Sequence, residues 1–496
     1  MNKRILITAS LAGLLALGGC KKDYLETVPS DAVSEAQIFS DITAVNATVE
    51  GLYKEMFTFA VGGGSHSDYG QKSIDLSLDL MGNDMVVHTQ GYSWYNTTYQ
   101  YTNWGLATTG QMPDFAWYRF YDMIKQANKL YNFVDGVKNA SSTQKESIKG
   151  QALGIRAYCY YNLANLYQQT YKGNESAKGV PIYTKDTTGG KARGTVQDVY
   201  NRIIADLTEA ETLLTGKTRT TKNYMDISVV RGFRARVALV QEDWANASKY
   251  ANLAKAGYPL MTTAQYTARS AFSSISNPEW MWGSIIPAAE ATIYASFFSH
   301  IDPNVGGYAA LGQQKKITKD LYDQIPTGDV RKTVFRAPGT GNTTIPDYCQ
   351  LKHQVPDLSN RWQADYLYMR ASEMFLIEAE ALARQGNDAG ARSVLESMVK
   401  VRFPAYSAGT RSGAALIAEI LLQRRIELWG EGFGLLDIKR LKTGLNRPTG
   451  AGNHGAPNFN PVVYTTGPAD NRFLMRIPQR ELDNNASMTP ADQNPE

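Results

Sequence analysis

The stretch from Asp365 to Arg402 constrains the fold more than any other part of this sequence, because apolar residues recur at helical spacing on both sides of one short break. Gly386 ends the first half, since glycine readily adopts the left-handed conformation in which many helices terminate. Asn387 and Asp388 follow, and their side-chain oxygens can cap a second helix. The stretch therefore predicts an antiparallel helical hairpin. Its apolar stripes comprise Leu367, Ala371, Met374, Ile377 and Ala381, then Ala391, Val394, Leu395 and Met398.

A similar unit stands upstream in the segment ALVQEDWANASKYANLAKAG, where Ala238 and Leu239 match Ala381 and Leu382. Stacked helix pairs of this kind form solenoids, in which small residues let the helix backbones approach closely. Two imperfect copies fit an internal repeat, and they also fit chance similarity between alanine-rich helices. Further segments have one apolar helical face, so the sequence predicts a mainly α fold. These segments are Asp41–Phe57, Asp114–Asp135, Ser147–Gln169, Val196–Leu214 and Ala414–Lys442.

Residues 257–361 break this helical pattern. They hold eight of the chain's 19 prolines and show no sustained helical period. So long an irregular stretch within a compact protein is expected to pack on the helices and to carry function. We therefore expect a helical scaffold at about 36–256 and 362–442, a loop-rich insert at about 257–361, and a turn-rich tail at 443–496.

The N-terminus carries an export signal. Lys3 and Arg4 precede the apolar run Ile5–Leu17, which is shorter than the roughly 20 residues that a membrane-spanning helix needs. Leu17-Gly18-Gly19-Cys20 then resembles a bacterial lipobox, after which residues 1–19 would be removed and Cys20 would be lipidated. An ordinary secretory leader followed by a chance cysteine is the alternative. Removing the two charges of this leader from the formal net charge of +4 leaves +2, so no bulk charge favours nucleic acid.

The sequence contains none of the motifs GxSxG, HExxH and CxxC, and we expect no catalytic site, no metal and no cofactor. Its 47 acidic residues still leave a glycosidase-like pair of carboxylates open. Asp75, Asp79 and Asp84 could converge on a cation, although capping or solvated aspartates fit their spacing better. Cys159 and Cys349 fit two buried thiols, with a single disulfide as the alternative.

One segment has the composition of a recognition surface. In YSWYNTTYQYTNW, from Tyr92 to Trp104, six of 13 residues are aromatic and none is aliphatic. A core strand would mix in Val, Ile or Leu, whereas here amides and hydroxyls stand between the rings. Ring faces can stack on the C–H face of a sugar or on a peptide side chain. The alternative is a loop whose rings pack onto the helices. The candidate ligand contacts are Trp94, Tyr95, Asn96, Tyr99, Tyr101 and Trp104.

Three further motifs resemble those of the SusD/RagB family of Bacteroidetes lipoproteins. Residues 370–381 resemble its "RxxExxLIxAEA" helix, and residues 425–440 resemble its "RxxELxxEGxRxxDLxR" segment. The second match departs from the pattern at Gly434, where an arginine is usual, which puts one local ionic contact in doubt. Residues 477–495 resemble the closing "IPxxE…QNP". Together with the lipobox, the motifs run from one end of the chain to the other.

The resemblance implies a scaffold of tetratricopeptide-like helix pairs that bears a loop-rich, irregular ligand-binding subdomain. It implies a lipid-anchored protein on the cell surface of the outer membrane that captures an oligosaccharide, or in some members a peptide, for a SusC-like TonB-dependent transporter. It also implies ligand contacts from irregular regions, which adds Trp282, Tyr294 and Tyr308. A surface hydrolase and a purely structural repeat adaptor are the competing classes.

Overall fold

The computed structural model describes residues 39–59, 65–102, 112–185, 189–455 and 458–496. The fold is mainly α, as predicted. The principal α-helices are α3 (Ile42–Lys54), α4 (Gln71–Leu80), α6 (Met112–Phe133), α7 (Ser142–Tyr167), α8 (Val196–Leu214), α9 (Ile227–Gln241), α10 (Trp244–Ala254), α14 (Ala371–Arg384), α15 (Asp388–Arg402), α16 (Gly413–Glu427) and α17 (Gly434–Leu441). Shorter ones are α5 (Asn96–Tyr99), α11 (Thr263–Thr267), α12 (Phe297–Ile301), α13 (Lys319–Asp323) and α18 (Gln479–Asn484). Single 3-10 turns are η2 (Val134–Gly136), η3 (Ala288–Glu290), η4 (Val330–Lys332), η5 (Asn471–Phe473) and η6 (Pro490–Asp492).

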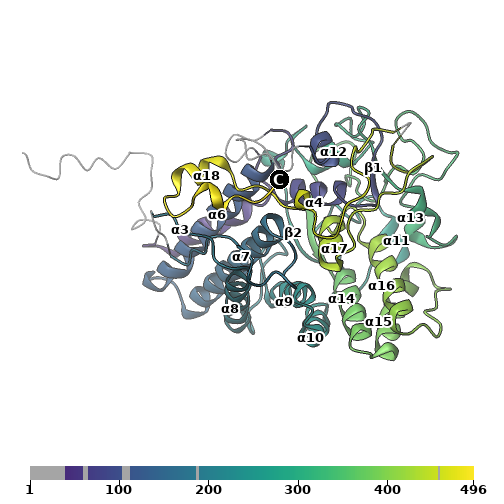
Figure 1. The fold of residues 1–496 in the computed structure, drawn as a ribbon. Helices are drawn as coiled ribbons and strands as arrows, with labels where there is room; N and C mark the ends of the chain where they lie inside the picture. The colour runs from purple at the N-terminus through teal and green to yellow at the C-terminus, as the bar shows by residue number, and fades with distance from the viewer. Residues whose placement is uncertain (1–38, 60–64, 103–111, 186–188, 456–457) are drawn as a thin grey trace, which may run out of the picture.

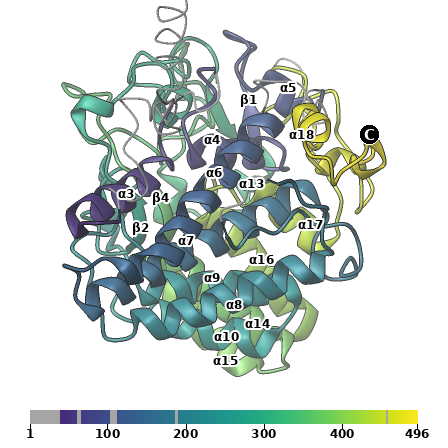
Figure 2. The same ribbon diagram turned by 90° about the vertical axis from the view of Figure 1, so that its left-hand side faces the viewer.

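The long helices form a stack in which most neighbours in sequence are neighbours in space. Helix α7 packs between α6 and α8, and α9 packs on α8 and α10. Helix α14 then lies against α10, α15 and α16, which joins the two halves of the scaffold (Figures 1 and 2). No helix among the described residues is both long and apolar enough to cross a membrane. The loop-rich residues cover one end of this stack.

The predicted hairpin is present as α14 and α15. Gly386 has a φ of 78°, in the left-handed region, and the Asn387 side chain accepts a hydrogen bond from the Gly390 N–H at 3.0 Å. The start of the first helix was predicted wrongly, because Leu367 lies in strand β4 (Tyr366–Arg370). Strand β4 pairs antiparallel with β2 (Trp280–Ser284), which stands far upstream in the loop-rich stretch. Because this partner is so distant in sequence, the local spacing of apolar residues could not reveal it.

A second short sheet joins other distant segments. Strand β1 (Met85–Val87) pairs antiparallel with β3 (Lys315–Ile317). The C-terminal tail returns to the first helices, as the Asn494 amide donates to the Tyr167 carbonyl at the end of α7 at 2.7 Å. Arg480 of α18 also binds Asp114 of α6 at 2.8 Å. The C-terminal tail therefore packs against α6 and α7 (Figure 1).

The spacing of the motif residues has a structural explanation, because these residues pair with one another inside the core. Arg370 binds Glu427 and Glu431 at 2.7 Å each, and Arg440 binds Glu380 at 2.8 Å. All five side chains are at least nine-tenths buried. Charges removed from water need such partners. These motif charges thus hold α14, α16 and α17 together.

Both cysteines within the described residues, Cys159 and Cys349, are buried free thiols, so the disulfide alternative is wrong. The three aspartates that could have shared a cation each have a different partner. Asp75 binds Lys72 at 3.1 Å, Asp84 binds Arg425 at 2.6 Å, and Asp79 accepts backbone N–H groups. Among the described residues, no group of three or more His, Cys, Asp or Glu side chains is placed to hold a metal ion.

Candidate ligand-binding surface

The aromatic segment that begins at Tyr92 folds as a turn followed by the single-turn helix α5. Ser93, Tyr95 and Tyr101 all adopt positive φ, at 67°, 61° and 60°. Non-glycine residues rarely take this conformation, and surrounding packing must hold them in it. These turns send some rings of the segment into the core and others outward. Trp104 lies outside the described residues.

Four of the predicted ligand contacts are core residues. The hydroxyl of Tyr95 donates to that of Tyr69 at 2.7 Å, and the Tyr99 hydroxyl shares a hydrogen bond of 2.7 Å with Nδ1 of His454. Tyr101 donates to the Met81 carbonyl. The Asn96 amide oxygen accepts from Gln313 Nε2 at 2.8 Å. All four are buried, at 7% exposure or less, so their assignment to a ligand surface is corrected.

The prediction for Trp282 is corrected in the same way. Its ring is fully buried, and its indole N–H donates to the Asn223 carbonyl at 3.0 Å. Tyr158, Phe233 and Tyr368 surround it edge-on. Composition could not separate these rings from surface rings, because each buried polar group found a partner in a distant segment.

The remaining predicted residues, Trp94, Tyr294 and Tyr308, come together on the surface with two more rings. We call this group the aromatic surface cluster and define it as His66, Tyr92, Trp94, Tyr294 and Tyr308. The Tyr308 ring centroid lies 5.3 Å from that of Tyr294, 5.5 Å from that of Tyr92 and 5.6 Å from that of Trp94. Four segments of the chain therefore supply one continuous set of rings.

His66 is the member that sequence reasoning missed. Its ring stacks on Trp94 at 5.4 Å and on Tyr294 at 6.1 Å, and its Nδ1 lies 2.6 Å from the Tyr308 hydroxyl oxygen. Its carbonyl is 2.8 Å from Nε2 of the buried His300. Burial holds the pKa of His300 well below its usual range, so this imidazole is neutral and donates to the carbonyl. A lone histidine carries no sequence signal for such a position.

The cluster exposes apolar faces that a soluble protein would otherwise cover. Tyr92 is 63% exposed and Tyr294 41%, whereas Tyr308 is buried beneath them and Trp94 is half-buried. Trp362 extends the edge, 6.4 Å from Tyr294, with the Arg361 guanidinium over its ring. Within the described residues, no carboxylate forms a hydrogen bond with any ring of the cluster. The surface can stack on a flat apolar face, and it holds rings rather than charges.

Comparisons with known proteins agree with this architecture. A family model described as "Starch-binding associating with outer membrane" matches residues 23–239, and the SusD family model matches residues 346–496. This chain belongs to the SusD/RagB family. No protein among the curated sequences matches the chain.

Solved structures resemble this SusD/RagB protein over nearly its whole length. A SusD-like carbohydrate binding protein from Bacteroides vulgatus has 26% identity and a TM-score of 0.79, with 92% of this chain and 99% of that chain covered. Surface glycan-binding protein A from Bacteroides thetaiotaomicron has 16% identity and a TM-score of 0.69, with 92% and 100% covered. At that lower identity, the second likeness concerns the fold alone.

Proposed function

We propose that this protein is a non-catalytic, cell-surface lipoprotein that captures an oligosaccharide on the aromatic surface cluster. The convergence of exposed rings from four segments carries the proposal, since sugar rings present C–H faces that stack on aromatic faces. Membership of the SusD/RagB family and the likeness to a carbohydrate binding protein support it. We further propose that the protein delivers the oligosaccharide to a SusC-like TonB-dependent transporter in the outer membrane.

Calorimetry of the purified protein with oligosaccharides of increasing length tests this function. We expect affinity to rise with length, because several rings can each stack on one sugar unit. We expect little dependence on salt, because a neutral ligand exchanges few charges with a cluster that holds no carboxylate. Chromatography of the recovered ligand should show no cleavage. If the protein binds peptides in place of sugars, with an affinity that depends on the peptide side chains, the oligopeptide alternative is favoured. If the recovered oligosaccharide is shorter than the one added, the hydrolase is favoured.

The lipid anchor is tested by replacing Cys20 with alanine. Cys20 lies outside the described residues, so its role stays a prediction from the lipobox. We expect wild-type protein in the outer-membrane fraction, accessible to protease on whole cells, and the variant released from that fraction, because several acyl chains anchor firmly. Mild detergent extracts of wild-type membranes should also contain a large β-barrel bound to the protein. Unchanged attachment of the variant would contradict the anchor, and recovery of the protein alone would contradict the partner.

A further inference from the structure

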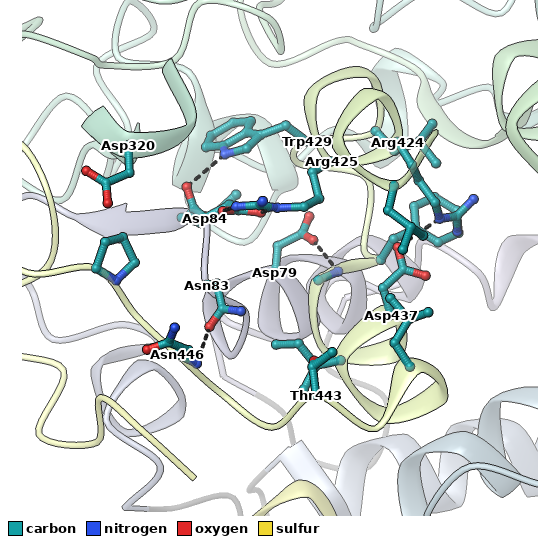
Figure 3. Close-up of a pocket in the computed structure, with 18 of the residues that line it drawn as sticks. Asp79, Asn83, Asp84, Asp320, Arg424, Arg425, Trp429, Asp437, Thr443 and Asn446 are labelled. Atoms are coloured by element: carbon teal, nitrogen blue, oxygen red, sulfur yellow. Dashed lines mark hydrogen bonds and ion pairs between the residues drawn. The ribbon is translucent and has the colours of Figure 1, made fainter. Parts of the chain in front are cut away.

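A cavity of about 640 Å³ lies beside helices α16 and α17 and shares no residue with the aromatic surface cluster. Pockets for small ligands commonly have this size and combine apolar walls with a few polar groups. Its walls include the apolar side chains of Met85, Leu428, Trp429, Phe433 and Ile438. Asp79 and Asp320 also line it, and Figure 3 shows both among the lining side chains.

The charges of the cavity do not balance. Asp84 is paired with Arg425 at 2.6 Å, and Asp437 is paired with Arg424 at 2.8 Å. Asp79 lacks such a partner, because no cation among the described residues lies within ion-pair distance of it. From the described residues, its carboxylate accepts two backbone hydrogen bonds, from Gly432 at 2.8 Å and Gly434 at 3.0 Å. A carboxylate can accept about four, so capacity remains.

Asp320 adds a second carboxylate without an ion pair in the described part of the chain. It lies on α13, lines the same cavity and accepts a hydrogen bond from the Asn453 amide at 2.9 Å. The Asp79 side chain, by contrast, is buried, with 7% exposure. A buried anion without an ion-pair partner is costly. Burial raises the pKa of Asp79 to about 7, although the two backbone hydrogen bonds act to lower it.

Gly434 lets α17 approach Asp79 of α4 closely. A Cβ atom at position 434 would lie 3.2 Å from both Cα and Oδ1 of Asp79, so a side chain here would start directly over the carboxylate. This is also the position at which the segment 425–440 departs from the pattern it resembles, with glycine in the place of arginine. The described chain thus places the buried Asp79 carboxylate at a roomy cavity and gives it no ion-pair partner, because Arg424 and Arg425 are paired with Asp437 and Asp84.

We propose that this cavity binds a small organic cation, whose N–H donors pair with Asp79 and whose apolar body lies against Phe433 and Leu428. Asp320, which lines the same cavity, attracts the same cation. Hydrogen bonds between charged groups are the strong ones, and low exposure strengthens them further. The proposal does not depend on the oligosaccharide function, because the two sites have no residue in common.

Benzamidine and benzamide form a matched pair of probes, because they share one shape and only benzamidine is a cation. Calorimetry on the full mature protein should show benzamidine binding at least tenfold more tightly than benzamide, as expected when one charged hydrogen-bonded pair is made. Asp79→Asn should remove that preference. Asp323→Asn is the control, because Asp323 lies on the same helix as Asp320 and is paired with Lys319 outside the cavity.

Two further measurements keep the test decisive if Asp79→Asn does not fold. Thr443→Trp places a large ring at the cavity lining and should abolish binding without touching Asp79. Wild-type affinity for benzamidine should also fall as the pH is lowered from 8 to 5.5, because Asp79 takes up a proton. Lys72 and Asp75 on α4, and the paired Arg424 and Asp437, are the other charged groups near it. Equal affinity for both probes, or unchanged binding in Thr443→Trp, would overturn the proposal.

Discussion

Replacing Glu427 with alanine is expected to lower the free energy of unfolding by about 3–5 kcal/mol, which is typical when one member of a buried ionic group is removed. The Glu427 carboxylate is fully buried and binds Arg370 at 2.7 Å, Arg402 at 3.1 Å and Arg331 at 3.5 Å. Burial alone would raise its pKa, but Arg402, Arg370 and Arg331 outweigh burial and hold the pKa of Glu427 below its usual range.

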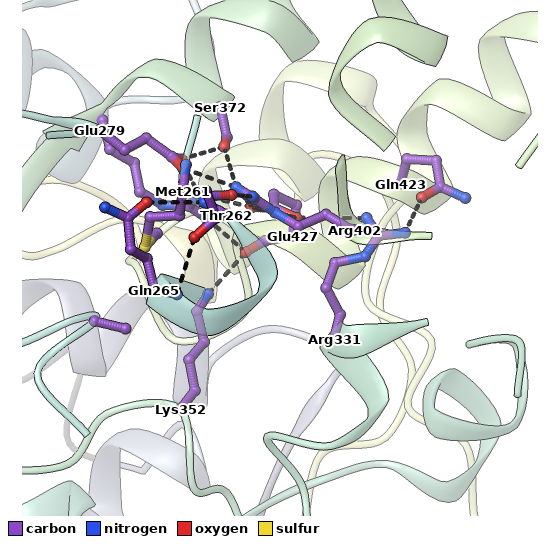
Figure 4. A network of polar contacts seen from close by, with 12 residues as sticks. Met261, Thr262, Gln265, Glu279, Arg331, Lys352, Ser372, Arg402, Gln423 and Glu427 are labelled. Atoms are coloured by element: carbon purple, nitrogen blue, oxygen red, sulfur yellow. Dashed lines mark hydrogen bonds and ion pairs between the residues drawn. The ribbon is translucent and has the colours of Figure 1, made fainter. Parts of the chain in front are cut away.

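Alanine at position 427 would leave four buried cations with three buried carboxylates. The cations are Arg331, Arg370, Arg402 and Lys352, and the remaining carboxylates are those of Glu279, Asp329 and Glu431. Figure 4 shows Arg402 and Arg331 directed toward Glu427. Glu279 also binds Arg370 at 2.7 Å and Arg402 at 2.8 Å. It cannot also take over the charge that Glu427 supplied to the same two arginines. Since this network joins Glu279, just before β2, and Arg331 of η4 to β4, α15 and α16, its loss should weaken the contact between the scaffold and the loop-rich region.

Urea unfolding followed by circular dichroism measures this loss. Glu290→Ala is the matched control, because Glu290 pairs with Lys54 on the surface, where both side chains are more than a third exposed. Such pairs contribute about 1 kcal/mol or less. Glu427→Gln, which keeps the shape and one acceptor, should fall between the two. If Glu427→Ala unfolds at the same urea concentration as the control, the network does not contribute to stability as argued.

Trp94→Ala is expected to weaken oligosaccharide binding about tenfold, since stacking on one aromatic ring contributes about 1–2 kcal/mol by analogy with stacked bases. Trp94 is half-buried, and its ring contacts both His66 and Tyr308. Its removal therefore also loosens neighbouring rings. A double variant that combines Trp94→Ala with Tyr294→Ala should bind more weakly still, because Tyr294 is a second ring of the cluster and is more exposed than Trp94. Calorimetry with the longest oligosaccharide that binds gives the affinities.

Tyr99→Phe is the control that separates surface rings from buried rings of the same segment. It keeps the ring and removes only the hydrogen bond to His454, so it should cost about 1 kcal/mol of stability and leave binding unchanged. Thermal unfolding checks that every variant is folded. Normal binding by folded Trp94→Ala and Tyr294→Ala would remove the aromatic surface cluster as the site. A loss in Tyr99→Phe equal to that in Trp94→Ala would show that the effect is indirect.

The aromatic segment shows where sequence reasoning stops. Its composition shows a concentration of aromatic rings. Whether each ring lies in the core or on the surface depends on its contacts with residues remote in sequence. Tyr99 is buried because His454 and Arg447 stand over it, from a part of the chain some 350 positions away. Strand β4 shows the same limit, since its pairing with β2 overrides the helical spacing between Leu367 and Ala371. Ring burial and strand pairing both depend on partner residues that a local sequence pattern does not identify.

The sequence by itself determined the mainly α scaffold, the hairpin at Gly386 and the family, because helical periods, caps and motif spacings act within a few residues. Only the tertiary structure decided which aromatic rings face outward, that His66 joins them, and that Asp79 lines a cavity without a counter-ion in the described chain. Each of these depends on segments far apart in the chain, as His66 and Tyr308 are. Their meeting is set by the packing of the whole core, which no short stretch encodes.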